Sequence, residues 1–394
     1  MTLPLEGIKI LDLCGQGPGP DATMHMGDLG ADVLLVEALG RRGRELPSAR
    51  EVSQKERRAS AVVAARRNKR SILLNLKLLD AREAFYRLVR EADVVMEAFR
   101  PGVVDRLGVH YETVRQINPR IVYCSISGYG QSGPYAGIPG HDLNYIATAG
   151  ALGGIGIPGG PPVIPFNLMG DRLGGYAVAF AIVSALMARA RTGEGQYLDL
   201  SMTDIMLGAL NQQLSWYFAD GTVPEPGRMR LNGGAPQYNV YQTADGNYIT
   251  VACLERHFYD NLCRALGLDD LISLYDEEER WHEVFKAFRE AFLTRTRDEW
   301  FEVLRDQDVC IAKVYRLDET PKDPQIQSRG MFLSIEDPDL GRIDQVGIPL
   351  KLAGVSREVR RVGPVPGQDT RAVLQEIGYQ DDAIDLMRAA GSVW

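Results

Sequence analysis

The sequence predicts an α/β fold, with a doubly wound, Rossmann-like large domain and a smaller α+β domain. In the first ~150 residues, short apolar runs alternate with helical segments, the pattern of parallel strands joined by crossover helices. These runs are residues 8–13, 32–37, 71–74, 94–97 and 121–125. Near residue 240 the pattern changes to a hairpin, in which segments 237–241 and 248–253 flank the turn Ala244-Asp245-Gly246-Asn247. This hairpin predicts the start of the smaller domain.

The length of 394 residues suggests roughly two or three domains. We predict a large domain over residues 1–225, a small domain over 226–325, and a segment, 326–394, that returns to the large domain. Residues 176–190 are apolar nearly all round, which predicts a buried helix. A final amphipathic helix is expected to begin near Asp369.

Composition excludes several classes of protein. The apolar and charged fractions, 45% and 24%, are ordinary for a globular protein. The formal charge of −8 argues against a dedicated nucleic-acid binder. The longest apolar stretch falls short of the ~20 residues of a membrane span. Five scattered cysteines without a CxxC pair predict neither disulfides nor a metal site, and favour a reducing, cytoplasmic location.

Residues 41–70 carry eleven Arg or Lys against three Glu. The stretch 41–58 has two equal interpretations, a solvated insertion or an ordered binding element. For the distal part, which includes Arg67, Lys69 and Arg70 and adjoins a strand, phosphate binding is more attractive. Arginine forks and lysine charges suit polyanionic phosphates.

A glycine turn after the first strand imitates a dinucleotide-binding fingerprint. Gly15 and Gly17 follow the strand, and Glu37 stands where an acid would bind a ribose. The third glycine of that fingerprint is replaced by Pro20. A structural turn is therefore the favoured interpretation.

Four acidic or imidazole side chains are candidates for catalysis. His141 and Asp142 precede a helix-like run, where they can form a tuned general base or merely a loop residue and a helix cap. Asp171 precedes the apolar helix, either as its cap or as a reactive carboxylate. Glu255 follows a strand and can be a first-turn acid of the next helix. Spacing alone favours the structural alternative for each.

Several motifs, however, occur together in a characteristic order between residue 5 and about residue 378. They include Gly17-Pro18-Gly19-Pro20, Asn68-Lys69-Arg70-Ser71-Ile72, Ser127-Gly128-Tyr129-Gly130-Gln131, Gly140-His141-Asp142, Gly170-Asp171 and Gly233-Gly234-Ala235-Pro236. As a set they resemble the family III coenzyme A transferase superfamily (CaiB/BaiF type). Within it, His141 with Asp142 and Glu255, and the Gly233 loop, resemble the α-methylacyl-CoA racemases.

The resemblance implies a coenzyme A thioester as substrate, no other cofactor, and a nucleotide bound by the large domain. The candidate binding residues are then Arg67, Lys69, Arg70, Arg100, Tyr129 and Gly130. It also implies an interlocked homodimer whose active site lies between one protomer's large domain and the partner's small domain. Glu255 is then able to come from the partner chain.

The implied reaction is inversion of the α-carbon of a 2-methyl, or other 2-substituted, acyl-CoA by two-base proton transfer through an enolate. His141 and Asp171 serve opposite faces of that carbon, Glu255 orients His141, and Asp142 supports the network. Backbone N–H groups near Asp171 are expected to stabilise the enolate oxygen.

Two alternatives remain. One is a family III transferase that moves CoA between carboxylic acids through an aspartyl-CoA intermediate at Asp171. The other is a CoA- or nucleotide-binding protein without this chemistry, including a dehydrogenase. Three residues depart from the family pattern, namely Asp21, Gly170 and Arg256, and the changes at Asp21 and Arg256 predict a polar or atypical acyl group.

Overall fold

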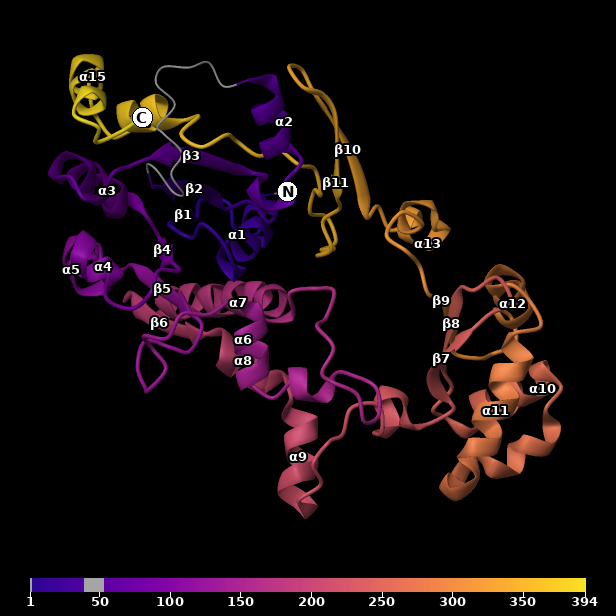
Figure 1. Ribbon diagram of the computed structural model, residues 1–394. Coiled ribbons are helices and arrows are strands. Elements are labelled where there is room, and N and C mark those ends of the chain that lie inside the picture. Colours follow the sequence, from indigo (N-terminus) through magenta and orange to yellow (C-terminus); the bar gives the residue numbers. More distant parts are fainter. Residues whose placement is uncertain (1, 39–52) are drawn as a thin grey trace. The chain divides into compact units, whose positions relative to one another are not determined.

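The computed structural model describes residues 2–38 and 53–394, which form two compact units (Figure 1). The first comprises Met1–Ala149, Pro165–Leu210 and Pro324–Trp394, and the second Gly150–Ile164 and Asn211–Asp323. Residues 150–164 and 211–225, which we assigned to the large domain, thus belong to the second unit. Most of the basic stretch 41–58, from residue 41 to residue 52, lies outside the described residues.

A six-stranded sheet with strand order β3-β2-β1-β4-β5-β6 forms the centre of the first unit, and every adjacent pair is parallel. The strands are β1 (Lys9–Asp12), β2 (Asp32–Glu37), β3 (Lys69–Leu73), β4 (Val94–Glu97), β5 (Val122–Ser127) and β6 (Gln196–Ser201). The sheet confirms the five predicted strands and the doubly wound class. We did not predict β6, an edge strand that is only partly buried and whose sequence lacks an apolar run.

Alternating side chains divide the unit's apolar core between the two faces of the sheet. Ile10, Val33 and Val122 belong to the cluster packed with α1 (Pro18–Asp28) and α7 (Met169–Thr192). Their neighbours Leu11, Leu34 and Tyr123 belong to the opposite cluster. That cluster is covered by α3 (Leu79–Glu91), α5 (Tyr111–Ile117), α14 (Thr370–Glu376) and α15 (Asp381–Ala389). Both faces are buried, so the strands read as continuous apolar runs.

The remaining elements of this unit lie around the sheet. They are α2 (Gln54–Ala61), α4 (Val103–Leu107), α6 (Asp142–Thr148), α8 (Met202–Ala209), α13 (Pro324–Ser328) and the antiparallel hairpin of β10 (Phe332–Asp337) and β11 (Gly341–Val346). The final amphipathic segment forms two helices, α14 and α15, and α14 starts directly after Asp369 as predicted.

Helix α7 packs against α1 through two glycines. A Cβ on Gly174 would lie 3.0 Å from Pro18, and one on Gly175 would lie 2.8 Å from the Asp21 Cβ. The helix begins seven residues before the predicted start at residue 176, and the prediction that it is buried holds for one face only. Tyr176, Phe180 and Met187 are exposed on the described chain.

Of the helices in the described ranges, only α7 is long and apolar enough, by length and composition, to cross a membrane, and core helices pass the same test. The absence of a membrane span therefore stays a prediction.

The second unit is built on a three-stranded antiparallel sheet of β7 (Tyr238–Gln242), β8 (Tyr248–Ala252) and β9 (Ile311–Lys313). Tyr238 pairs with Ala252, which confirms the predicted hairpin. Its helices are α9 (Asn211–Asp220), α10 (Arg256–Leu266), α11 (Trp281–Phe292) and α12 (Arg297–Leu304). Its separate core contains Tyr241, Tyr259, Phe288, Phe292 and Trp300.

Candidate active site

A cavity of about 1070 Å³ opens in the first unit at the carboxyl ends of β1, β4 and β5. Segments 15–18 and 98–101, which follow β1 and β4, line it, and so does segment 126–129 at the end of β5. In an open parallel sheet, ligands bind where the strand order reverses, and here that point lies between β1 and β4. The topology therefore predicts a binding site at this edge.

His141 and Asp171 both line this cavity, each at the start of a helix. Asp142, buried between them, joins the two helix starts, because its Oδ1 accepts the backbone N–H of Asp171 at 2.9 Å. The backbone N–H of His141 donates to the Asn144 side chain at 3.0 Å, which fixes the entry to α6. The structure thus brings three of the four catalytic candidates together.

Gly170 gives the Asp142 carboxylate room to reach the start of α7. A Cβ at this position would lie 3.0 Å from Asp142 Oδ1, a tight contact. Any larger residue here would require that carboxylate to shift by a few tenths of an ångström. The hydrogen bond also occupies the Asp171 N–H, so this member of the N–H groups near Asp171 is not available to an enolate oxygen.

Burial, and after it the neighbouring charge of Asp142, raise the pKa of Asp171 from its ordinary 3.8 to about 6. Arg172 and His141 oppose this rise, and Asp21 adds to it. A carboxyl group with such a pKa is mainly ionised at neutral pH, yet its protonated form is accessible. It can therefore both accept and return a proton near neutral pH.

Aromatic side chains support the loop that carries His141. The Tyr145 ring lies so close to Gly128 and Gly140 that a Cβ on either glycine would overlap it, at 2.0 and 2.7 Å. Tyr129 packs edge-on against Tyr145, with ring centroids 5.1 Å apart. Tyr129 lines the cavity, whereas Gly130 is buried beside it and its N–H donates to Ser127 Oγ at 2.9 Å.

The glycine turn after β1 contributes residues 15–18 to the cavity wall, so a purely structural role for it stays a prediction. Gly17 has a φ of 76° and precedes Pro18 at the start of α1. Glu37, which stands where a dinucleotide-binding protein has its ribose-binding acid, is already paired within the protein. Arg66 donates to both of its carboxylate oxygens, at 3.1 and 2.9 Å.

Two of the four predicted phosphate-binding cations prove to be internal, which corrects our prediction. The Arg67 side chain is fully buried and holds both oxygens of Asp28, at 2.9 and 2.6 Å. Lys69 is buried as well, and its Nζ donates to Thr23 Oγ1 at 2.6 Å and to the Pro20 carbonyl at 2.9 Å. Both charged groups are buried against protein acceptors. Neither cation is therefore accessible to a nucleotide in the cavity.

Arg70 is also engaged with protein carboxylates. Its guanidinium bridges Glu376, at 2.9 and 2.7 Å, and Asp32, at 3.1 Å. Arg70 does not line the cavity, so its assignment to nucleotide binding is not supported either. Arg100, by contrast, is exposed and lines the cavity. It is the one predicted cation that the geometry leaves open for a phosphate.

Glu255 belongs to the second unit, where it directly precedes α10 and is exposed. Arg256, one of the departures from the family pattern, pairs with Asp260 at 2.9 Å on the same helix. A role for Glu255 beside His141 stays a prediction.

The cavity wall also holds an ion pair to which the sequence analysis gave no role. Arg172 donates through Nη1 to Oδ2 of Asp21, and both residues line the cavity. The sequence signals were the departure at Asp21 and the position of Arg172 directly after Asp171. Their pairing could not be found from spacing, because 151 positions separate them.

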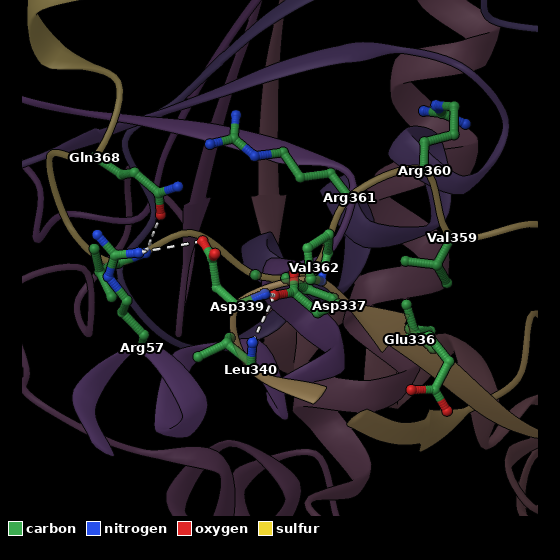
Figure 2. Close-up of a pocket in the computed structure, with 14 residues that line it drawn as sticks. Arg57, Glu336, Asp337, Asp339, Leu340, Val359, Arg360, Arg361, Val362 and Gln368 are labelled. Carbon is green, nitrogen blue, oxygen red and sulfur yellow. Dashed lines mark hydrogen bonds and ion pairs between the residues drawn. The ribbon is translucent and has the colours of Figure 1, made fainter. Parts of the chain in front are cut away.

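A second cavity, of about 320 Å³, lies beside the β10–β11 hairpin (Figure 2). In Figure 2, Arg57 reaches toward Asp339, with which it forms an ion pair at 3.7 Å. Arg361 also lines this cavity, and it is bound to Asp369 at 2.8 Å. None of the predicted site residues lines it.

A family model described as CoA-transferase family III matches residues 5–370. The chain belongs to CoA-transferase family III. This assignment confirms the resemblance drawn from the motifs.

Family III relatives of two activities are similar over nearly the whole chain. Human "alpha-methylacyl-CoA racemase" is 33% identical over 390 residues, covering 97% of this chain and 95% of the relative. "Formyl-CoA:oxalate CoA-transferase" of Escherichia coli is 30% identical over 416 residues, covering 98% and 99%. These identities leave isomerase and transferase open.

Solved structures have the same fold. A CaiB/BaiF family protein from Brucella suis superposes with a TM-score of 0.80 at 27% identity, covering 96% of this chain and 100% of that one. A Mycobacterium tuberculosis protein gives 0.78 at 26% identity, covering 94% and 98%.

Proposed function

We propose that this family III enzyme is an acyl-CoA racemase or epimerase that inverts the α-carbon of a 2-methyl, or other 2-substituted, acyl-CoA. The observation that carries the proposal is the junction of α6 and α7, where Asp142 ties the start of the His141 helix to the start of the Asp171 helix. An imidazole and a carboxyl group therefore border one cavity.

The chemistry follows from the acidity of the substrate. A thioester carbonyl acidifies the neighbouring C–H, because the carbanion spreads onto oxygen as an enolate. Inversion needs one group to remove the proton and another to return a proton from the opposite face. Asp171, with a pKa of about 6, suits one task at neutral pH, and His141 suits the other. Each group is expected to contribute roughly 10²–10⁴-fold in rate.

The test follows the α-hydrogen. The enzyme is incubated with a single enantiomer of a 2-methylacyl-CoA in heavy water, and deuterium at the α-carbon and loss of optical purity are measured. We expect both to increase together. Absence of exchange with every branched thioester tried, from an enzyme shown to bind CoA, would rule the proposal out.

Coenzyme A transfer is the second candidate function, favoured by the similarity to formyl-CoA:oxalate CoA-transferase. In this reaction the Asp171 carboxylate attacks the thioester carbonyl, which yields a mixed anhydride and releases CoA thiolate. The thiolate then attacks the aspartyl carbonyl, releasing the acid and leaving an aspartyl-CoA thioester. Hydroxylamine or borohydride added to enzyme and acyl-CoA then modifies Asp171. Mass spectrometry of the peptide that contains Asp171 distinguishes the two functions.

We further propose that CoA binds through its phosphates to Arg100 and that no other cofactor takes part. Arg100 is exposed at the cavity while Arg67 and Lys69 are buried. Calorimetric titration with CoA and, separately, with NAD tests this and the dehydrogenase alternative. We expect binding of CoA alone, weakened by Arg100→Ala.

A cytoplasmic homodimer completes the proposal. Apolar side chains are strongly exposed on the described chain, among them Phe180 at 76% and Phe166 at 88%. Such exposure often marks an interface with another chain. The five cysteines are all free, as in a reducing compartment. Light scattering coupled to gel filtration tests the dimer, and Phe180→Asp is expected to shift the mass toward that of one chain.

A further inference from the structure

We propose that Arg172 selects the substrate by binding a carboxylate on the acyl group, so that the substrate is the monothioester of a dicarboxylic acid. This inference rests on the proposed function in one respect, namely that the cavity binds acyl-CoA. It holds for inversion and for CoA transfer alike, because it concerns the acyl group and not the reaction.

The first argument is the position of Arg172. It follows Asp171 directly on α7, and both residues line the same cavity. Consecutive helical residues diverge by about 100°, so the two side chains leave the helix in different directions. The long Arg172 side chain is therefore able to reach a group some bonds away from a carbon held at Asp171.

The second argument is the unused hydrogen-bonding capacity of Arg172. Its guanidinium donates through Nη1 to Asp21, and no other acceptor for it occurs among the described residues. An arginine has five N–H donors in a fixed fork. The Arg172 side chain is 49% exposed, whereas that of Asp21 is 10% exposed. Most of its donors therefore have no acceptor among the described residues, and Arg172 lines the cavity.

Some arginines of this chain, such as Arg66, Arg67 and Arg189, pair with one carboxylate. Three others show that a guanidinium can also bridge two. Arg70 bridges the carboxylates of Glu376 and Asp32. Arg297 holds Glu319 and also contacts Asp298, and Arg371 joins Asp381 and Asp385. Each of these three engages two carboxylates, while Arg172 engages one. A substrate carboxylate provides the second partner in the same bridging arrangement.

The third argument is that the pair sits on rigid support. Gly175 lets α7 approach α1 beside Asp21, because any side chain there would collide with the Asp21 Cβ at 2.8 Å. The Asp21–Arg172 pair therefore holds the guanidinium between two packed helices. A purely apolar acyl group would have to displace water from this ion pair without replacing its hydrogen bonds, at a cost in affinity.

The experiment compares two thioesters of matched shape. One is 2-methylglutaryl-CoA, thioesterified next to the methyl group. The other is 2,5-dimethylhexanoyl-CoA, in which an isopropyl group replaces the free carboxylate. Calorimetry gives Kd for each, and α-proton exchange in heavy water is recorded in parallel. We expect the carboxylate ligand to bind the native enzyme roughly 10–100-fold more tightly, the range typical of a charged hydrogen bond.

Arg172→Leu is expected to abolish this ratio, and Arg172→Lys, which keeps the charge and loses the fork, to retain part of it. Arg115→Leu is the matched control, since Arg115 is exposed on α5, pairs with a single carboxylate, Glu112, and does not line the cavity. Circular dichroism verifies that each variant folds.

A ratio near one in the native enzyme, or a ratio that Arg172→Leu leaves unchanged, overturns the inference. Equal weakening of both ligands by Arg172→Leu overturns it too, and assigns Arg172 an effect on Asp171 instead. If binding follows the expected pattern while neither thioester exchanges its α-proton, the inversion reaction fails and the inference stands.

Discussion

Helix α1 carries charged and polar side chains toward two regions of the first unit that use them differently. On one side, Asp28 binds Arg67, and Thr23 accepts from Lys69, all fully buried; we call these four residues the closed set. On the other side, Asp21 pairs with Arg172 beside Asp171 and His141 in the cavity; we call these the open set.

This difference shows how the role of a charged side chain can be inferred from its burial and its hydrogen-bond partners. In the closed set the cations meet their acceptors within the protein, as burial away from water demands. Burial perturbs a pKa in each set, since it lowers that of Lys69 to about 8 and raises that of Asp171, but in the open set the perturbed group lies in a cavity beside the unpartnered donors of Arg172. Unused capacity and a perturbed pKa inside a cavity are features of a site that binds and transforms a ligand. The basic residues of a sequence cannot be sorted in this way before their partners are known.

The largest expected effect is on catalysis, in the open set. His141→Ala removes one of the two proposed proton carriers, and we expect α-proton exchange of a 2-methylacyl-CoA to fall by roughly 10²–10⁴-fold. His282→Ala, at an exposed histidine of α11 in the second unit, is the control and should exchange normally. Equal rates for the two variants would contradict the assignment of His141.

The next effect concerns stability, in the closed set. Arg67→Met leaves the buried carboxylate of Asp28 without its cation, and we expect a loss of about 3–5 kcal/mol in the free energy of unfolding. The double variant with Asp28→Leu should recover much of this loss. Arg70→Met, at a partly exposed pair, should cost no more than about 1 kcal/mol. Denaturant titration measures all three, and similar losses for Arg67→Met and Arg70→Met would contradict the expected difference between a fully buried and a partly exposed ion pair.

The third effect is a change in pH dependence. Asp171 must be ionised to accept a proton, so exchange from the enantiomer it serves should fall as the pH drops through about 6. Asp142→Asn keeps an oxygen for the Asp171 N–H and removes the charge that helps to raise this pKa. The acidic limb of the rate profile should move toward 3.8, the ordinary value, without reaching it, because burial remains the larger cause. An unmoved limb would show that Asp142 acts by position alone.

The smallest effect is a gain in stability. The folded-state pKa of Asp171, about 6, lies above its ordinary 3.8. Its contribution to stability is therefore complete below about pH 3.8 and is lost as the pH rises through about 6. Asp171→Asn does not titrate, so it should stabilise the fold at pH 7 by about 1 kcal/mol, a value reduced for partial exposure. At pH 3.5 we expect no gain. A gain of the same size at both pH values would indicate improved packing instead.

The sequence predicted the fold where burial produces a pattern. Five strands of the sheet are largely buried and contain apolar runs, whereas β6 mixes polar with apolar residues and is only partly buried, so it was not predicted. The start of α7 was placed late because Gly170, Asp171 and Arg172 interrupt the apolar pattern at the point where they build the site.

The candidate site was predicted only in part, for a related reason. His141, Asp142 and Asp171 were found through motifs, and the cavity does bring them together. Lys69 and Arg67 were misassigned because their partners, Thr23 and Asp28, lie about 40 positions away on α1, and no local pattern reveals such a pairing. The pairing of Asp21 with Arg172 was missed because it depends on how closely α1 approaches α7.

The return of the chain to the first unit after residue 323 has a consequence for synthesis. Asn75 N–H donates to the Ser392 carbonyl at 2.8 Å, Leu74 forms a bridge with Val393, and Ser71 N–H donates to Asp369. During synthesis, one face of β3 therefore stays uncovered until the C-terminal segment, some three hundred residues later in the chain, has left the ribosome. Until then the nascent sheet exposes Ile72 and Leu74 to its surroundings, and a chaperone that binds extended apolar segments is best placed to protect it.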